Sequence, residues 1–175
     1  VARDLVKHIL TRSNVKWTRS TRVPRTGDMY VDMLPSFPAI RSLLSMSQEM
    51  RLLPGNDGNV STRNGTVGCL VTPRKVDKST VGDEGFIAAS FVTENEIEFF
   101  GGMGGSKPSI DASVHLRLYN WLPKLDSIVH FHRGYVLSAN FFTTHPFPCG
   151  TLEEAQEIYN CMGATEYPRS PRWSR

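Results

Sequence analysis

Two histidines, His130 and His132, lie two positions apart in a β-prone run. On a strand, side chains at this spacing point to the same face, with Cβ atoms roughly 6–7 Å apart. Two imidazoles placed in this way can bind one metal ion, and Zn²⁺ readily takes such ligands. The pattern leaves open the alternative of two polar side chains on the exposed face of an edge strand.

An acidic residue, Asp111, precedes this run at the start of a predicted helix. Its carboxylate could act as a third metal ligand or as a general acid/base. It could equally be an ordinary first-turn acid, which the helix dipole favours. His115 follows four residues later on the same helix face, where it either orients Asp111 or is a core histidine with satisfied hydrogen bonds. We favour the second interpretation of His115.

A second group of residues has the chemistry to bind an anion. Backbone N–H groups in the tight turn at Gly58 and Asn59 can form an anion-binding nest. Arg74 and Lys75, which follow Thr72 at the far end of the same predicted hairpin, would add positive charge. The alternative is a pair of solvated turns.

Hydrophobic periodicity and turn signals place these residues on a regular series of elements. Asn64-Gly65 is a strong hairpin signal, and Thr151 with Glu154 forms a capping box that opens a helix. The pattern predicts helices over residues 36–50, 109–122 and 151–161, a short helical piece from about residue 134, a flexible loop over 101–106, and strands over 60–63, 66–72, 86–92, 96–100 and 127–132. This order predicts an α/β fold, a sheet covered by helices.

The net charge of +3 is unevenly distributed. Residues 1–26 carry seven Lys or Arg against one acid, a local charge of +6, and residues 163–175 carry +2, which leaves −5 for the part between. We expect an extended basic arm and linker over residues 1–35, a folded domain over 36–162 and a Pro/Arg-rich tail over 163–175. Basic arms bind acidic protein or nucleic acid, or are targeting remnants or solvated tails.

Three cysteines without a Cys-x-x-Cys spacing indicate neither a disulfide framework nor a zinc ribbon. We therefore expect a reducing intracellular compartment, either the cytoplasm or an organelle. The sequence has no run of about 18 apolar residues, so we expect no transmembrane helix.

Several of these segments together carry a family likeness. They are residues 58–63 (GNVSTR), 69–73 (CLVTP), 107–115 (KPSIDASVH), 128–132 (IVHFH) and 148–151 (PCGT). In order and spacing they resemble the class II aldolase/adducin family, across roughly residues 36–161. That family includes sugar-phosphate aldolases, an epimerase, a dehydratase and the non-catalytic adducin head. The resemblance implies a mostly antiparallel central sheet flanked by helices, and homo-oligomers or subunits of larger complexes.

The resemblance also implies roles for individual residues. His130 and His132 would hold a divalent metal, usually Zn²⁺, that stabilises an enediolate. Asp111 would be the catalytic acid/base. Gly58, Asn59, Thr72, Arg74, Lys75 and Ser109 would bind the substrate or its phosphate, so that a sugar phosphate would be the substrate of an active enzyme.

Three departures from the family pattern favour lost catalysis. Ile110 replaces a phosphate-binding Ser, and Arg74-Lys75 replaces a Thr-Gly pair. The family's third metal-binding His, in a downstream His-His-Gly strand, has no counterpart here, and His145 and His8 are the spare candidates. We therefore expect a degenerate aldolase-like module that serves as a structural or binding subunit of a larger assembly. The alternative is a zinc-dependent sugar-phosphate aldolase or epimerase.

Overall fold

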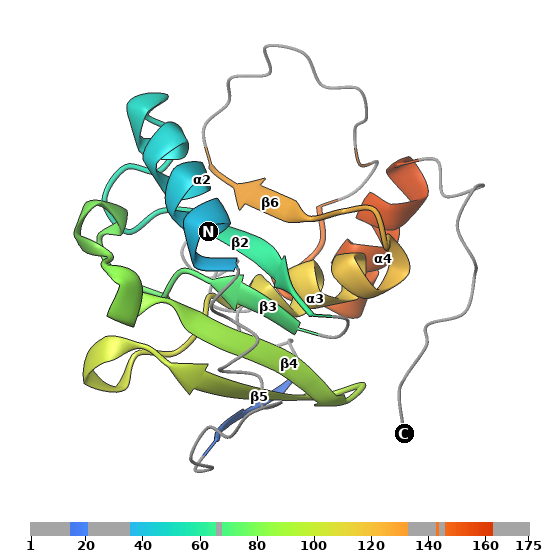
Figure 1. The fold of residues 1–175 in the computed structure, drawn as a ribbon. Coiled ribbons are helices and arrows are strands. Elements are labelled where there is room, and N and C mark those ends of the chain that lie inside the picture. Colours follow the sequence, from blue (N-terminus) through green and yellow to red (C-terminus); the bar gives the residue numbers. More distant parts are fainter. Residues whose placement is uncertain (1–14, 21–35, 66–67, 133–142, 144–145, 163–175) are drawn as a thin grey trace, which may run out of the picture.

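The computed structural model describes residues 15–20, 36–65, 68–132, 143 and 146–162. A six-stranded sheet in the order β1-β5-β4-β3-β2-β6 forms its centre (Figure 1). The strands are β1 (Lys16–Arg19), β2 (Asn59–Asn64), β3 (Gly68–Val71), β4 (Ile87–Thr93), β5 (Glu96–Gly101) and β6 (Ser127–His130). All neighbouring strands are antiparallel except β1 and β5, which are parallel. The predicted α/β fold with a mostly antiparallel sheet flanked by helices is confirmed.

Helices cover both faces of the sheet. They are α2 (Phe37–Glu49), α3 (Ala112–Trp121) and α4 (Leu152–Cys161), accompanied by the 3₁₀ turns η2 (Lys78–Thr80), η3 (Asp83–Gly85) and η4 (Met103–Gly105). Alternate residues of one strand point to opposite faces. Accordingly, Leu70 of β3 packs with α2, whereas its neighbours Cys69 and Val71 pack with α3. The helix α4 lies against α3 and extends that side of the molecule (Figure 1).

The N-terminal basic segment contributes a strand that the sequence pattern did not predict. The sequence pattern predicts an extended basic arm and linker over residues 1–35 and no strand there, whereas Lys16–Arg19 pairs with β5 as the edge strand β1. Trp17 packs against the core on the α3 face of the sheet. The Lys16 Nζ atom lies 2.8 Å from Oε1 of Glu96. The short run has little apolar periodicity of its own, so only pairing with β5 gives it a defined structure.

The predicted hairpin of β2 and β3 is present, with a longer connection than Asn64-Gly65 indicated. Asn64 pairs with Gly68, so the connection comprises residues 65–67. Gly65 has a φ of +60°, a left-handed conformation that glycine adopts without steric cost.

Other elements differ from their predicted bounds. The helix predicted over 109–122 begins at Ala112, and the strand predicted over 127–132 ends at His130. The loop predicted over 101–106 contains the end of β5 and the turn η4. The helical piece predicted from about residue 134 lies outside the described residues.

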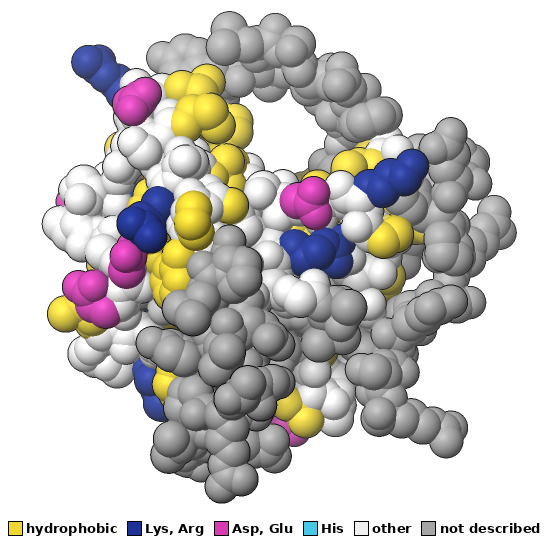
Figure 2. Space-filling model, in the orientation of Figure 1, with side chains coloured by type: hydrophobic (Ala, Val, Ile, Leu, Met, Phe, Trp, Pro, Cys, Tyr) yellow, Lys and Arg dark blue, Asp and Glu magenta, His cyan; other side chains and the backbone are white. Residues whose placement is uncertain are grey.

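The surface view shows hydrophobic side chains gathered along α2 (Figure 2). Met46 and Met50 of this region are 50% and 57% exposed. Within the described part of the chain, no helix has the length and apolarity needed to cross a membrane.

Candidate functional site

Asp111 lies at the centre of the candidate site. It occupies the N-cap position of α3, but its side chain does not cap the helix. Instead, its Oδ2 atom accepts hydrogen bonds from Asn59 Nδ2 at 2.9 Å and from Ser109 Oγ at 3.2 Å. Its Oδ1 atom is buried and has no hydrogen-bond partner among the described residues. Asp111 therefore presents one unpaired carboxylate oxygen.

The sheet places two further polar side chains beside Asp111. Asn59 begins β2 and is the register partner of His130 at the end of β6. The His130 Nδ1 atom lies 3.6 Å from Asp111 Oδ2. Burial lowers the pKa of His130, and the charge of Asp111 opposes that shift. Asn59 is 1% exposed, and its Oδ1 atom, like Oδ1 of Asp111, is buried without a partner among the described residues.

Gly58 allows this close approach of β2 and β6. Its φ is +63°, and a Cβ atom there would overlap the carbonyl oxygen of His130 and the side chain of Leu53. A residue with a side chain at position 58 would therefore have to displace the backbone at His130 and the side chain of Leu53.

The two histidines of the predicted metal pair are near each other. Their ring centroids are 4.9 Å apart, although β6 ends at His130 and His132 lies beyond it on the surface. Throughout the described ranges, no three His, Cys, Asp or Glu side chains converge as a metal site would require. The spare candidates His8 and His145 lie outside those ranges. The described side chains thus provide parts of a zinc site and do not fit a complete one.

A pocket of about 270 Å³ adjoins Asp111. Its lining residues are Asp111, Val114, His115, Leu118, Ile128, Val129, His130, Phe131, Glu154 and Ile158. Among these described residues there are two carboxylates and neither Lys nor Arg. The described lining therefore combines two carboxyl groups and two imidazoles with apolar side chains.

Sequence analysis missed Glu154 as a residue of this pocket. Its capping role is present, because Thr151 Oγ1 accepts a hydrogen bond from the N–H of Glu154 at 3.2 Å. The Oε2 atom of Glu154 also accepts from the N–H of Gly150 at 2.7 Å, and Ser113 Oγ of α3 donates to the Gly150 carbonyl at 2.7 Å. Burial raises the pKa of Glu154 to about 7, and the charge of Asp111 adds to the shift. The capping-box pattern alone carried no signal of this second role.

His115 is a buried histidine with a satisfied hydrogen bond. Its Nδ1 atom lies 2.8 Å from Ser61 Oγ, which is also 2.8 Å from the hydroxyl of Tyr119. Burial lowers the pKa of His115 to about 3, so that the ring is neutral at physiological pH. The structure agrees with the interpretation of His115 as a core histidine, and His115 also lines the pocket.

The predicted phosphate-binding residues lie on three segments that contact one another, residues 58–59, 72–75 and 109. Thr72 is fully buried, and its hydroxyl accepts a hydrogen bond from the N–H of Val60 at 3.2 Å. Arg74 and Lys75 are exposed in the next turn, where the N–H of Arg74 donates to the carbonyl of Lys107 at 2.9 Å. None of the six predicted phosphate-binding residues is among those that line the pocket beside Asp111. Gly58, Asn59 and Ser109 lie next to Asp111 and His130, and the hydrogen bonds of Thr72 and Arg74 join them to Val60 and Lys107, near Asn59 and Ser109 in the chain.

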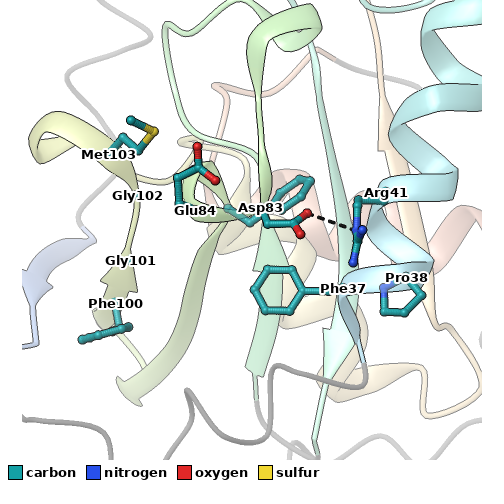
Figure 3. Close-up of a pocket in the computed structure, with 10 residues that line it drawn as sticks. Phe37, Pro38, Arg41, Asp83, Glu84, Phe100, Gly101, Gly102 and Met103 are labelled. Carbon is teal, nitrogen blue, oxygen red and sulfur yellow. Dashed lines mark ion pairs between the residues drawn. The ribbon is translucent and has the colours of Figure 1, made fainter.

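A larger pocket of about 740 Å³ lies at the start of α2. Phe37, Pro38 and Arg41 line one side of it and face Phe100, Gly101, Gly102 and Met103 (Figure 3). The Nε atom of Arg41 lies 3.0 Å from Oδ1 of Asp83. Of the described residues around this pocket, none is a predicted site residue, so the smaller pocket is the candidate site.

Known proteins share this sequence pattern and this fold. The pattern of the class II aldolase and adducin N-terminal domain matches residues 40–171, and the chain belongs to that family. It is 24% identical over 136 residues to an L-fuculose phosphate aldolase of Methanococcus maripaludis, covering 65% of this chain and 69% of that one.

The fold is also that of a solved structure. YgbL of Escherichia coli, described as a candidate aldolase/epimerase/decarboxylase, superimposes with a TM-score of 0.57 and 16% identity, covering 78% of this chain and 73% of that one. An L-fuculose 1-phosphate aldolase superimposes with a TM-score of 0.47 and 21% identity, covering 57% and 45% of the two chains. The family and the fold are therefore those that the sequence motifs predicted.

Proposed function

We propose that this chain is a ligand-binding module of the class II aldolase type, with a degenerate metal centre, and that it acts as a subunit of a larger assembly. The observation that carries this proposal is the pair of unpaired oxygens, Oδ1 of Asn59 and Oδ1 of Asp111. A buried acceptor without a partner costs about 1–3 kcal/mol. Asp111 lines the pocket and Asn59 is hydrogen-bonded to it, and two such acceptors there indicate that a ligand or water supplies the missing donors.

The arrangement of Asp111 supports the degenerate metal centre. A catalytic zinc site takes three protein ligands and leaves one position open. Here the Oδ2 atom of Asp111 already accepts from Asn59 and Ser109, and the described side chains supply only His130 beside it and His132 next to His130. A third ligand would have to come from elsewhere in the chain or from another subunit.

The alternative function is a zinc-dependent sugar-phosphate aldolase or epimerase. The separation of 3.6 Å between His130 Nδ1 and Asp111 Oδ2 favours it. His130 and His132 would hold the metal, which when bound would supply Lewis-acid stabilisation of an enediolate. In that case Asp111 would move a proton at its carboxylate, and Asn59 would hold the carboxylate in position.

Metal content separates the two functions. We expect the full chain, purified without chelator, to contain less than about a tenth of an equivalent of zinc by mass spectrometry. His130→Ala and His132→Ala should then contain the same amount as the parent chain. One equivalent of zinc that both substitutions remove would support the enzyme and would contradict the degenerate centre.

The assembly part of the proposal is tested separately. Sedimentation velocity on the full chain and on a chain without residues 1–14 should show whether the basic arm contributes to assembly. Binding to nucleic acid would weaken by roughly 0.7–0.9 log units per log unit of salt for each phosphate contact, whereas binding to acidic protein would depend less on salt. A monomer that binds neither partner would contradict the subunit role.

A further inference from the structure

We infer that His115 presents a fixed hydrogen-bond acceptor to the pocket beside Asp111, and that Ser61 and Tyr119 hold its imidazole in that state. This inference rests on the proposed ligand-binding function, because it names a residue that contacts the ligand. His115 lines the pocket, whereas Ser61 and Tyr119 are buried and are not among its lining residues. Ser61 and Tyr119 are therefore positioning residues, which act on a ligand through the ring of His115.

A row of polar side chains between β2 and α3 brings these residues together. Residues two apart on a strand share a face roughly 6–7 Å apart, and residues four apart on a helix are separated by a rise of about 6 Å. The two spacings match, so Asn59 of β2 contacts Asp111 of α3 and Ser61 contacts His115. Tyr119, one helical turn further on, also contacts Ser61. Asp111 and His115 are the members of this row that line the pocket.

The number of available protons decides which nitrogen of His115 carries one. The Tyr119 hydroxyl lies 3.0 Å from the Ser61 carbonyl oxygen and 2.8 Å from Ser61 Oγ, which lies 2.8 Å from His115 Nδ1. A carbonyl oxygen only accepts, so the Tyr119 hydroxyl donates to it. The Ser61 hydroxyl then donates to the Tyr119 oxygen. The third hydrogen bond, between Ser61 and His115, therefore needs a proton on Nδ1.

The alternative tautomer leaves one of the three contacts without a proton. With its proton on Nε2, His115 brings none to Ser61, and the two hydroxyl protons would have to serve three contacts. Burial keeps the ring neutral, so these two tautomers are the states that compete. All three side chains are buried, where an unmade hydrogen bond is costly. The Nδ1–H tautomer is thus the one that satisfies the whole cluster.

This tautomer leaves Nε2 of His115 without a proton. Nδ1 is engaged with Ser61, so Nε2 is the ring nitrogen left for a ligand in the pocket, where it accepts and cannot donate. Oδ1 of Asp111, another lining residue, is likewise an acceptor without a partner among the described residues. A hydroxyl or N–H group of the ligand would satisfy each of them. A free sugar and a sugar phosphate both carry such hydroxyl groups.

Nitrogen NMR on the ligand-free chain tests the tautomer directly. Protonated and unprotonated imidazole nitrogens have widely separated chemical shifts, and two-bond proton–nitrogen correlations distinguish the two ring positions. The full chain is labelled with ¹⁵N and measured at pH 7, and the His115 signals are identified by their loss in His115→Gln. We expect a protonated Nδ1 and an unprotonated Nε2. A ring protonated on Nε2, or one that averages between both states, would overturn the inference.

Two matched hydroxyl deletions test the positioning role. Tyr119→Phe leaves His115 Nδ1 as the remaining partner of the Ser61 hydroxyl, so we expect the ring proton to move to Nε2 and the two nitrogen shifts to exchange. Tyr159→Phe removes another buried hydroxyl, one without a partner among the described residues, and should leave the His115 signals unchanged. Ser61→Ala removes the acceptor of Nδ1–H and should also move the proton to Nε2. An unchanged tautomer in folded Tyr119→Phe and Ser61→Ala would overturn the positioning role.

A probe ligand separates this inference from the binding function. L-fuculose 1-phosphate is titrated into the labelled parent chain, and calorimetry measures its binding. We expect Nε2 of His115 to shift with the binding curve and Nδ1 to shift much less. Binding of the probe with an unmoved Nε2 would overturn the contact to His115 and leave the binding function intact. No binding to a chain with the Nδ1–H tautomer would support the tautomer and contradict the binding function for this compound.

Discussion

The side-chain amide of Asn59 donates to Oδ2 of Asp111 over 2.9 Å, although 52 positions separate the two residues in the sequence. The bond joins the start of β2 to the start of α3, on the side where β6 brings His130. It orients the amide so that its oxygen faces away from the carboxylate.

Replacement of the Asn59 amide by a carboxylate should destabilise the fold. In Asn59→Asp the donor to Asp111 is lost and two carboxylates lie in contact, so we expect the free energy of unfolding to fall by about 1–3 kcal/mol at pH 7. Urea unfolding at pH 7 and pH 4 measures the effect, which should shrink at pH 4 because the pair can share a proton. Asn95→Asp, in an exposed turn, should change stability by less than about 0.5 kcal/mol. Equal effects of the two substitutions would contradict the Asn59–Asp111 bond.

Two glycines with nearly the same φ separate backbone strain from crowding. Gly58 and Gly65 have φ values of +63° and +60°, but a Cβ meets neighbours only at Gly58. Gly65→Ala should cost about 1–2 kcal/mol for the left-handed conformation alone, and Gly58→Ala should cost clearly more. Denaturant midpoints measure the costs, and the His130 side-chain resonances in NMR should shift only in Gly58→Ala. Unchanged His130 resonances in Gly58→Ala would show that Gly58 does not position this histidine.

Glu154 should make stability depend on pH in the neutral range. Burial raises its pKa to about 7 from an ordinary value of 4.5, so the folded chain holds the proton that the unfolded chain releases. The resulting stabilisation is complete below about pH 4.5 and is lost as the pH rises towards 7. When the pH is raised from 5 to 8, the free energy of unfolding of Glu154→Gln should therefore fall by about 1–2 kcal/mol less than that of the parent chain, after allowance for solvent screening. Urea unfolding at both pH values measures this difference, and Glu153→Gln should follow the parent. If the free energy of unfolding changed with pH by the same amount in Glu154→Gln and in the parent, the raised pKa of Glu154 would be refuted.

The edge strand β1 should contribute to the stability of the fold through the packing of Trp17 rather than through the ion pair of Lys16. Trp17 packs against the core, so Trp17→Ala should lower the free energy of unfolding by about 1–3 kcal/mol. Lys16→Ala removes an exposed ion pair with Glu96 and should cost less than about 1 kcal/mol. Thermal unfolding of both variants measures the two costs. A Trp17→Ala variant as stable as the parent would mean that β1 is not part of the stable sheet.

Most of the fold followed from local sequence signals. The helices α2 and α4 and the pairing of β2 with β3 were predicted from periodicity, the capping box at Thr151 and the turn signal at Asn64-Gly65. These signals act over a few residues, where intrinsic propensity and turn chemistry decide the conformation. The combined motifs also predicted the family, because their order and spacing are a property of the sequence itself.

The sequence by itself therefore determined the elements, the family and the identity of the polar residues near Asp111. Only the tertiary structure decided that Lys16–Arg19 joins the sheet, that Glu154 faces the pocket and that Arg74 and Lys75 do not. It also decided that the side-chain N–H of Asn59 donates to Asp111 and that Oδ1 of Asn59 has no partner among the described residues. The physical reason is that burial and long-range hydrogen bonds set the partners and charge states of these groups, and neither can be read from residues that are neighbours in the chain.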